Sequence, residues 1–132
     1  MTKVLVLLHK RADLGWDAFL RYWREEHRPI ALRLPGLRGY VENQAPEVAN
    51  LPYGVAELWF DSPAAFQAAL TAPEGRAALA DLAHFVDLDK TGMTVVSEVV
   101  PWGDPALAAD PAAGLPAEER RRQADRSDPA TT

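Results

Sequence analysis

One histidine stands on the apolar face of a predicted helix, where an aliphatic residue would be expected. At about 100° per residue, the helical period, His27 falls near the middle of an apolar stripe. The members of this stripe are Trp16, Leu20, Trp23, Ile30, Ala31 and Leu34. A neutral imidazole takes up and returns protons near neutral pH, which suits general acid–base catalysis. The pattern equally fits a buried structural histidine, bonded for example to the Glu25 carbonyl that Pro29 leaves without its amide.

Two further residues carry chemistry on the strands that should follow this helix. Tyr40 has a phenol that can donate a hydrogen bond to a substrate oxygen, or it packs as a core or interface tyrosine. Glu57 interrupts an apolar strand, and a carboxylate there must be paired or have a raised pKa. It is either a general base or the partner of an arginine such as Arg33 or Arg38.

His84 lies off the apolar stripe of the second helical region, so a continued helix would point it into solvent. If that helix instead ends near Ala83, His84 would lie in a loop over the cavity mouth, where Asp81 could orient it. The aromatic residues Trp23, Trp59 and Phe85 are candidates to line a pocket for a flat apolar molecule. Ordinary core packing is the alternative for most of the aromatic residues.

The composition excludes several classes of function. A net charge of −5 and a pI near 5.1 argue against nucleic acid, which requires a basic surface. With no cysteine and no HxH or HxxxH pair, neither a metal site nor a cysteine nucleophile is expected. There is no glycine-rich phosphate loop, signal peptide or apolar run of about 20 residues. The default expectation is a cytoplasmic protein that binds no cofactor, nucleic acid or membrane.

The order of predicted elements is strand, helix, strand, strand, helix, strand. The strands are expected at 3–9, 37–44, 54–60 and 93–100. The first helix is expected from 14 or 16 to 34, with Asp13 as its cap. The second begins at Ser62-Pro63, breaks at Pro73 and resumes to about Ala83. This βαββαβ order is the ferredoxin-like arrangement, an α+β fold with an antiparallel sheet.

A homodimer joined through the sheet follows from the strand pattern. Two helices can cover only one face, yet the first and last strands are apolar on both faces, as in Val4, Val6 and Leu8 against Leu5 and Leu7. An uncovered apolar face of that size is unusual in a monomer.

Residues 103–132 differ in composition from residues 1–102, which should form the single folded domain. The tail is rich in Pro, Ala, Asp and Arg and contains no aromatic residue. It cannot bury enough apolar surface to offset its ordering entropy, so it is expected to be mostly disordered. The alternative is a tail that wraps around a partner subunit.

The chain resembles the EthD domain family, a branch of the dimeric α+β-barrel superfamily. The resemblance rests on KVLVLLHKR, YWREEHRPIALRLPGLRGYVEN, GVAELWFDS and DLAHFVDLD, in that order, over about residues 3–100. Relatives include a cofactor-free methylmuconolactone isomerase and polyketide cyclases and dehydratases. The founding member assists an ether-degrading cytochrome P450 system.

The isomerase motif H-x(7)-PG-L-x-x-Y matches His27, Pro35-Gly36, Leu37 and Tyr40. The resemblance therefore implies that His27 and Tyr40 face the cavity. Leu58 stands where the isomerase has a cysteine, and residues 45–54 lack its loop histidine, so a retained pocket with different chemistry is implied.

These observations predict a cofactor-independent cyclase, dehydratase or isomerase for a hydrophobic, oxygenated small molecule. The candidate catalytic residues are His27, Tyr40 and His84, and the candidate substrate-binding residues are Trp23, Leu58, Trp59 and Phe85. The alternatives are a cofactor-free monooxygenase of aromatic polyketides and a non-catalytic binding or accessory protein.

Overall fold

The computed structural model describes residues 1–45, 52–103, 118 and 122. By compactness the chain divides into two units, Met1–Glu98 and Val99–Thr132. The first unit contains every helix and strand discussed below. Nearly all of the predicted disordered tail lies outside the described residues.

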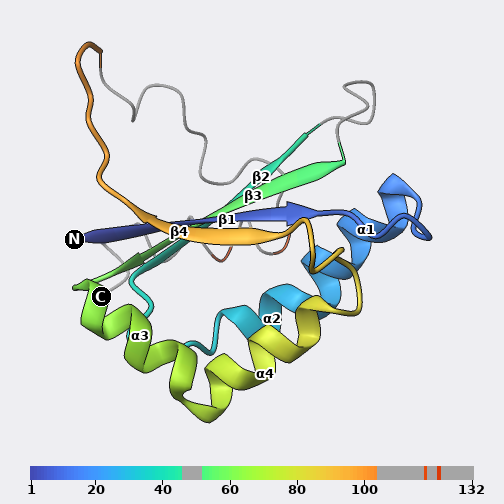
Figure 1. The fold of residues 1–132 in the computed structure, drawn as a ribbon, viewed down its shortest axis with the longest axis horizontal. Coiled ribbons are helices and arrows are strands. Elements are labelled where there is room, and N and C mark those ends of the chain that lie inside the picture. Colours follow the sequence, from blue (N-terminus) through green and yellow to red (C-terminus); the bar gives the residue numbers. More distant parts are fainter. Residues whose placement is uncertain (46–51, 104–117, 119–121, 123–132) are drawn as a thin grey trace. The chain divides into compact units, whose positions relative to one another are not determined.

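The first unit has the predicted ferredoxin-like α+β fold (Figure 1). In chain order its elements are β1 (Thr2–His9), α1 (Trp16–Tyr22), the π-helical turn η1 (Trp23–His27), α2 (Arg28–Ala31), β2 (Gly39–Gln44), β3 (Tyr53–Phe60), α3 (Pro63–Thr71), α4 (Pro73–Leu82) and β4 (Gly92–Val96). The strands form one antiparallel sheet in the order β2-β3-β1-β4.

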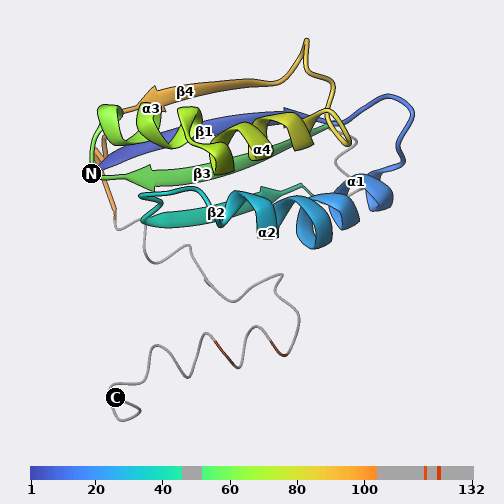
Figure 2. The ribbon, with the colours of Figure 1, turned by 90° about the horizontal axis from the view of Figure 1, so that it is seen from below.

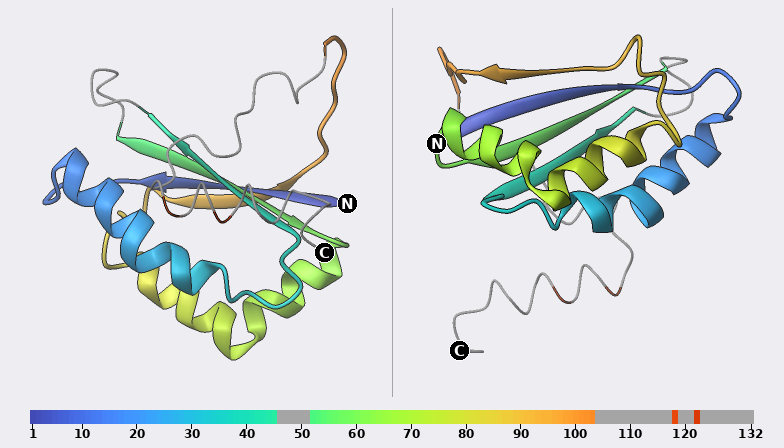
Figure 3. Two further views of the ribbon diagram at one scale, coloured as in Figure 1. Left: turned by 180° about the vertical axis from the view of Figure 1, so that it is seen from behind. Right: turned by 60° about the horizontal axis from the view of Figure 1, so that its bottom comes forward.

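The helices lie on one face of the sheet, as Figures 2 and 3 show from further directions. On that face Val4, Val6 and Leu8 of β1 are buried. The register pairs Val6 with Ala56 and with Met93, and Tyr40 with Leu58, so these side chains share the helix-covered face. The core therefore lies between the sheet and the helices.

The second helix cap follows the sequence prediction, whereas the first helix ends at Ala31, three residues before the predicted end at Leu34. Gly36 adopts a positive φ of 77° after α2, a conformation that glycine enters at little cost. The hydroxyl of Ser62 accepts a hydrogen bond of 3.0 Å from the Ala65 amide, and Pro63 occupies the first turn of α3. The predicted break at Pro73 separates α3 from α4.

Three further local predictions were wrong. The cap of α1 is Gly15, not Asp13, because the Asp13 carboxylate pairs with the Arg11 guanidinium at 2.7 Å. The last strand ends at Val96 rather than at Val100. The partners of Glu57 are Lys3, at 2.5 Å, and Asn43, at 3.0 Å, and not an arginine. Leu5 is directly opposite Glu57 in the β1–β3 pair, and Lys3, two residues earlier on the same face of β1, reaches Glu57 diagonally.

The first helix changes from α-helical to π-helical winding in the turn that contains His27. Its middle section, η1, is a π-helix, and the Arg28 amide at its end bonds the Trp23 carbonyl, five residues back. Pro29 lacks the amide that would bond Glu25, so the α-helical pattern cannot run unbroken through this turn. Single π-helical turns are frequent at functional sites. Both Trp23 and His27 are buried in this section.

Candidate active site

His27 is buried between the helix layer and the sheet, and a carboxylate holds its ring. Its Nδ1 lies 2.8 Å from Oδ2 of Asp81, and only 8% of the His27 side chain and 10% of the Asp81 side chain are exposed. An ionised carboxylate can only accept hydrogen bonds, so Nδ1 carries the proton. Nε2 then remains as the unprotonated nitrogen, and it has no hydrogen-bond partner among the residues that the structure describes.

The other oxygen of Asp81 accepts one hydrogen bond, and the ring of His84 lies near it. The Tyr22 hydroxyl donates to Oδ1 at 2.7 Å, and His84 Nδ1 lies 3.3 Å from the same atom. Burial, together with the neighbouring Asp81, raises the pKa of Tyr22 to about 12, so its hydroxyl stays protonated. The Asp81 carboxylate therefore contacts three side chains, the buried imidazole of His27, the phenol of Tyr22 and the exposed imidazole of His84.

Phe85 packs against the ring of His27. Its fully buried ring lies 4.9 Å from the His27 ring and 5.1 Å from the Tyr22 ring, measured between centroids. Burial among these rings lowers the pKa of His27, and it outweighs the opposing effect of Asp81. His27 is therefore neutral at pH 7, the protonation state of a general base.

A narrow cavity of about 50 Å³ lies beside His27, between the sheet and the helices. His27 and Tyr40 are the two polar residues that border it, and the surface that faces the cavity is apolar. The apolar residues are Val6, Leu8, Ala31, Leu34, Ala56, Leu58, Phe66, Leu70, Ala78, Leu79, Leu82 and Met93. Leu79 and Met93 are each 38% exposed, so these two flexible side chains form the rim of the cavity.

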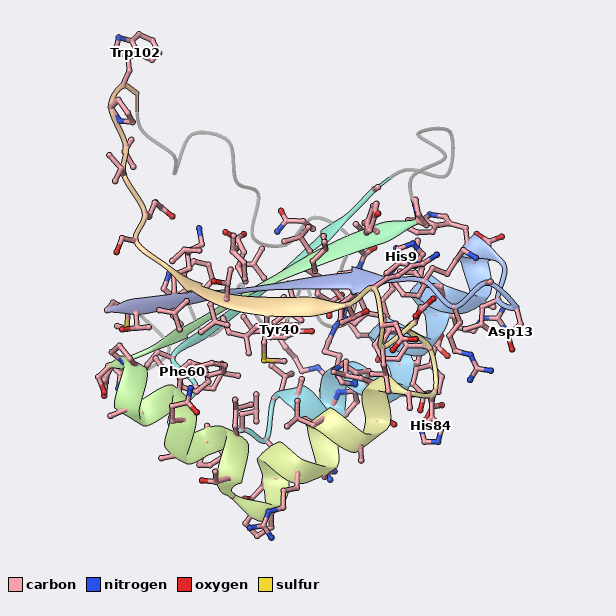
Figure 4. All side chains as sticks on the ribbon, in the orientation of Figure 1. His9, Asp13, Tyr40, Phe60, His84 and Trp102 are labelled. Carbon is pink, nitrogen blue, oxygen red and sulfur yellow. The ribbon has the colours of Figure 1, made fainter. Side chains whose placement is uncertain are left out.

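Tyr40 enters the cavity from β2, and Figure 4 shows it in the layer between the sheet and the helices. Its hydroxyl accepts a hydrogen bond of 3.0 Å from Nε1 of Trp23. Burial raises the pKa of Tyr40 strongly, and the nearby Glu42 carboxylate adds to that effect. Tyr40 therefore keeps its proton, and Glu42 is itself held by the Arg28 guanidinium at 2.7 and 2.8 Å.

The other predicted site residues lie in different places. Leu58 lines the cavity, whereas Trp23 and Phe85 are fully buried behind it. Trp59 lies on the opposite, helix-free face, where the Lys3 ammonium is 5.3 Å from its ring. The helix does end at Leu82, but the His84 side chain is 64% exposed and does not line the cavity (Figure 4).

The sequence pattern missed two parts of this arrangement. It associated Asp81 with His84, three residues away, but not with His27, 54 residues away, because only the tertiary fold brings those two together. It also gave Tyr22 no role, although Tyr22 lies five residues before His27. The one available signal was Asp81 itself, an acidic residue on a buried helix face.

A larger hollow of about 540 Å³ opens on the surface beside the turn that follows α4. Its charged lining includes Arg11 and Asp13, which pair with each other, and Asp87 and Asp89. It is shallow, and none of the three histidines lines it. We therefore place the candidate active site at the smaller cavity, where a buried base meets an apolar lining.

Two further observations concern the described part of the chain. Within it, no three His, Asp or Glu side chains are grouped so that they could hold a metal ion. No helix in that part has both the length and the apolar character needed to cross a bilayer.

The chain resembles known proteins in sequence and in structure. It is 27% identical over 103 residues to an uncharacterised 11.0 kDa protein encoded in the thcB-thcC intergenic region of Rhodococcus erythropolis, a match that covers 76% of this chain and 98% of the relative. An EthD family protein from Bacillus halodurans superposes with a TM-score of 0.62 at 20% identity, over 75% of this chain and all of the other.

Two other solved structures share the fold. A dimeric ferredoxin-like protein of unknown function from Thermobifida fusca gives a TM-score of 0.58 at 16% identity, over 74% of this chain and 90% of that one. SnoaB, a cofactor-independent oxygenase from Streptomyces nogalater, gives a TM-score of 0.52 at 15% identity, over 76% of this chain and 98% of that one. The EthD domain model matches residues 11–89, which include His27, Tyr40 and Asp81, and the chain belongs to the EthD domain family.

Proposed function

We propose that this protein is a cofactor-independent acid–base enzyme for a hydrophobic, oxygenated small molecule such as a polyketide or aromatic-derived intermediate. The observation that carries the proposal is the buried pair of His27 and Asp81 beside an apolar cavity. A neutral imidazole whose Nδ1 is fixed by a carboxylate has one free nitrogen with which to exchange a proton. This arrangement suits a general base.

The reaction begins at a carbon–hydrogen bond next to a carbonyl group. Nε2 of His27 removes the proton, and the Tyr40 hydroxyl, which keeps its own proton, donates a hydrogen bond to the oxygen on which negative charge develops. Return of the proton to another atom gives isomerisation, loss of a neighbouring hydroxyl gives dehydration, and attack on a second carbonyl gives cyclisation. His27 then hands back the proton that it removed.

The substrate must widen the cavity when it binds. About 50 Å³ holds only a few water molecules, whereas sites for small organic molecules usually measure about 300–1,000 Å³. Met93 on the edge strand β4 and Leu79 on α4 form the exposed rim. The methionine chain is unbranched and adaptable, so the cavity can open between these two elements.

Cofactor-free oxygenation is the second candidate, supported by the fold shared with SnoaB. The same base would remove a proton from a phenol or anthrone, and molecular oxygen would then react with the resulting anion. A protein that only binds such molecules is the third candidate, and it would show no turnover.

Anthrone is a probe that separates these candidates, because the carbonyl acidifies its C10 protons. In deuterium oxide under nitrogen, an acid–base enzyme should accelerate deuterium exchange at C10 well above the buffer rate, as followed by NMR. Under oxygen, an oxygenase should convert anthrone and O2 into anthraquinone and water. Binding without either reaction would contradict the enzyme proposal and support a binding protein.

We also propose that the protein is a homodimer joined through the helix-free face of the sheet. Leu7 and Val41 on that face are each 41% exposed, and the Glu57 carboxylate there is paired with the Lys3 ammonium. The solved neighbours include a dimeric ferredoxin-like protein. A second copy would cover the apolar residues that the helices of one chain leave open.

The dimer proposal predicts a sedimentation mass of twice the 14.5 kDa chain. Leu7→Lys should give monomers, because it places a charge in the interface. Leu32→Lys, at a residue 53% exposed at the end of α2, should leave the dimer intact. A wild-type protein that sediments as a monomer at micromolar concentration would refute the proposal.

A further inference from the structure

The two oxygens of Asp81 have different partners. Oδ2 faces the buried His27 at 2.8 Å, while Oδ1 accepts the Tyr22 hydroxyl at 2.7 Å and lies 3.3 Å from His84 Nδ1. Tyr22 belongs to α1 and Asp81 to α4. The hydroxyl of Tyr22 therefore joins the two helices at the carboxylate that holds the candidate base.

This arrangement addresses a conflict in the proposed mechanism. A buried carboxylate beside an imidazole favours the imidazolium form, but a general base must be neutral before it reacts. Each hydrogen bond that Oδ1 accepts stabilises the negative charge on that oxygen, and it weakens the attraction of the carboxylate for a proton on His27. The Tyr22 hydroxyl, which donates to Oδ1, is thus placed to weaken the attraction of Oδ2 for a proton on His27.

We propose that Tyr22 is a positioning residue for the reaction at His27: its hydroxyl occupies the second oxygen of Asp81, so that the carboxylate orients the imidazole without holding it in its protonated form. His84 supports the same oxygen from the surface, with a longer contact and a largely exposed ring. This inference rests on the proposed function.

The neighbouring charges are the same whether or not the Tyr22 hydroxyl is present. The Glu42 carboxylate on β2, which is paired with Arg28, raises the proton affinity of His27. Glu26 acts on Tyr22 from η1, and Arg11, from the loop after β1, donates to the Ala83 carbonyl. A change of the His27 titration in a Tyr22 variant would therefore report on the Asp81 contact.

The decisive variant is Tyr22→Phe, which retains the ring packed against Phe85 and removes only the hydroxyl. The titration of His27, followed by ¹⁵N NMR of the labelled imidazole, should shift to higher pH, with about a threefold or larger gain in proton affinity, which is half a pKa unit. The low-pH limb of the anthrone exchange rate should shift in the same direction. Tyr53→Phe, at an exposed tyrosine on β3, is the matched control and should change neither quantity.

His84→Ala provides an independent variant, because an exposed side chain tolerates replacement. It should shift the His27 titration in the same direction by a smaller factor, and the double variant should shift it further than either change alone.

A Tyr22→Phe protein that loses thermal stability but titrates as the wild type would overturn the positioning role. If Tyr22→Phe does not fold, an unchanged titration in His84→Ala would overturn it. The NMR result does not depend on turnover, so an absence of anthrone exchange would overturn only the proposed function.

Discussion

Replacing His27 by glutamine should lower the rate of C10 exchange in anthrone by about 10²- to 10⁴-fold, the usual contribution of a general acid–base group. A glutamine amide can still donate a hydrogen bond to Oδ2 of Asp81, which His27 now occupies at 2.8 Å. It has no nitrogen that exchanges a proton near neutral pH. The folded structure should therefore survive while turnover is lost.

His27→Leu is the matched comparison for stability. The apolar stripe of the first helix suggests that leucine would be at least as stable as histidine. In the folded structure, however, leucine would leave Oδ2 of the buried Asp81 without a partner, at a cost of about 1–3 kcal/mol. Urea denaturation should rank His27→Gln above His27→Leu. A His27→Gln protein that retains wild-type exchange would show that His27 is not the base.

Gly75→Ala should reduce the free energy of unfolding by about 3 kcal/mol or more. Exchanging glycine for alanine within a helix usually stabilises a protein, by up to about 1 kcal/mol. Here a Cβ on Gly75 would lie 2.0 Å from the Ala69 carbonyl oxygen and 2.7 Å from Cα of Leu70. Both atoms belong to the backbone of α3, so the sharp junction between α3 and α4 would have to open, beyond the usual cost of overpacking.

The control for this prediction is Gly92→Ala at the start of β4, where a Cβ would meet nothing within 4 Å. It should change the free energy of unfolding by no more than about 0.5 kcal/mol. Chemical denaturation of both variants measures the difference. An unchanged or raised stability in Gly75→Ala would mean that α3 and α4 do not meet as closely as the structure shows. Because α4 carries Asp81, this variant should also disturb the His27 site.

The sequence predicted the fold because periodicity and capping are local signals. The strands, the Ser62 cap and the break at Pro73 each depend on a few neighbouring residues. The error at Asp13 arose because its carboxylate pairs with Arg11, two residues earlier, and does not cap the helix. The error beyond Val96 arose because no pairing with β1 is found past Val96 in the described part of the chain, and local propensity contains no information about strand pairing.

The candidate site was only partly predictable, for the same reason. His27 stood out because a titratable ring interrupted an apolar stripe, and Tyr40 followed from the family motif. Both residues line the same cavity in the folded structure. The link from His27 to Asp81 spans 54 residues, and only the packing of α4 against η1 creates it. The position of Trp59 on the helix-free face follows from strand register, which alternates side chains between faces.

The central claim is that His27 is a neutral base whose Nδ1 is held by Asp81, and ¹⁵N NMR of the imidazole in the wild-type protein tests it most directly. We predict a protonated Nδ1 and an unprotonated Nε2 at pH 7, with the pKa of His27 below its usual value of 6.5 because of burial. Since the base works only when neutral, exchange activity should be lost as the pH falls through that pKa. An imidazolium at pH 7, or a proton on Nε2 in place of Nδ1, would contradict the claim.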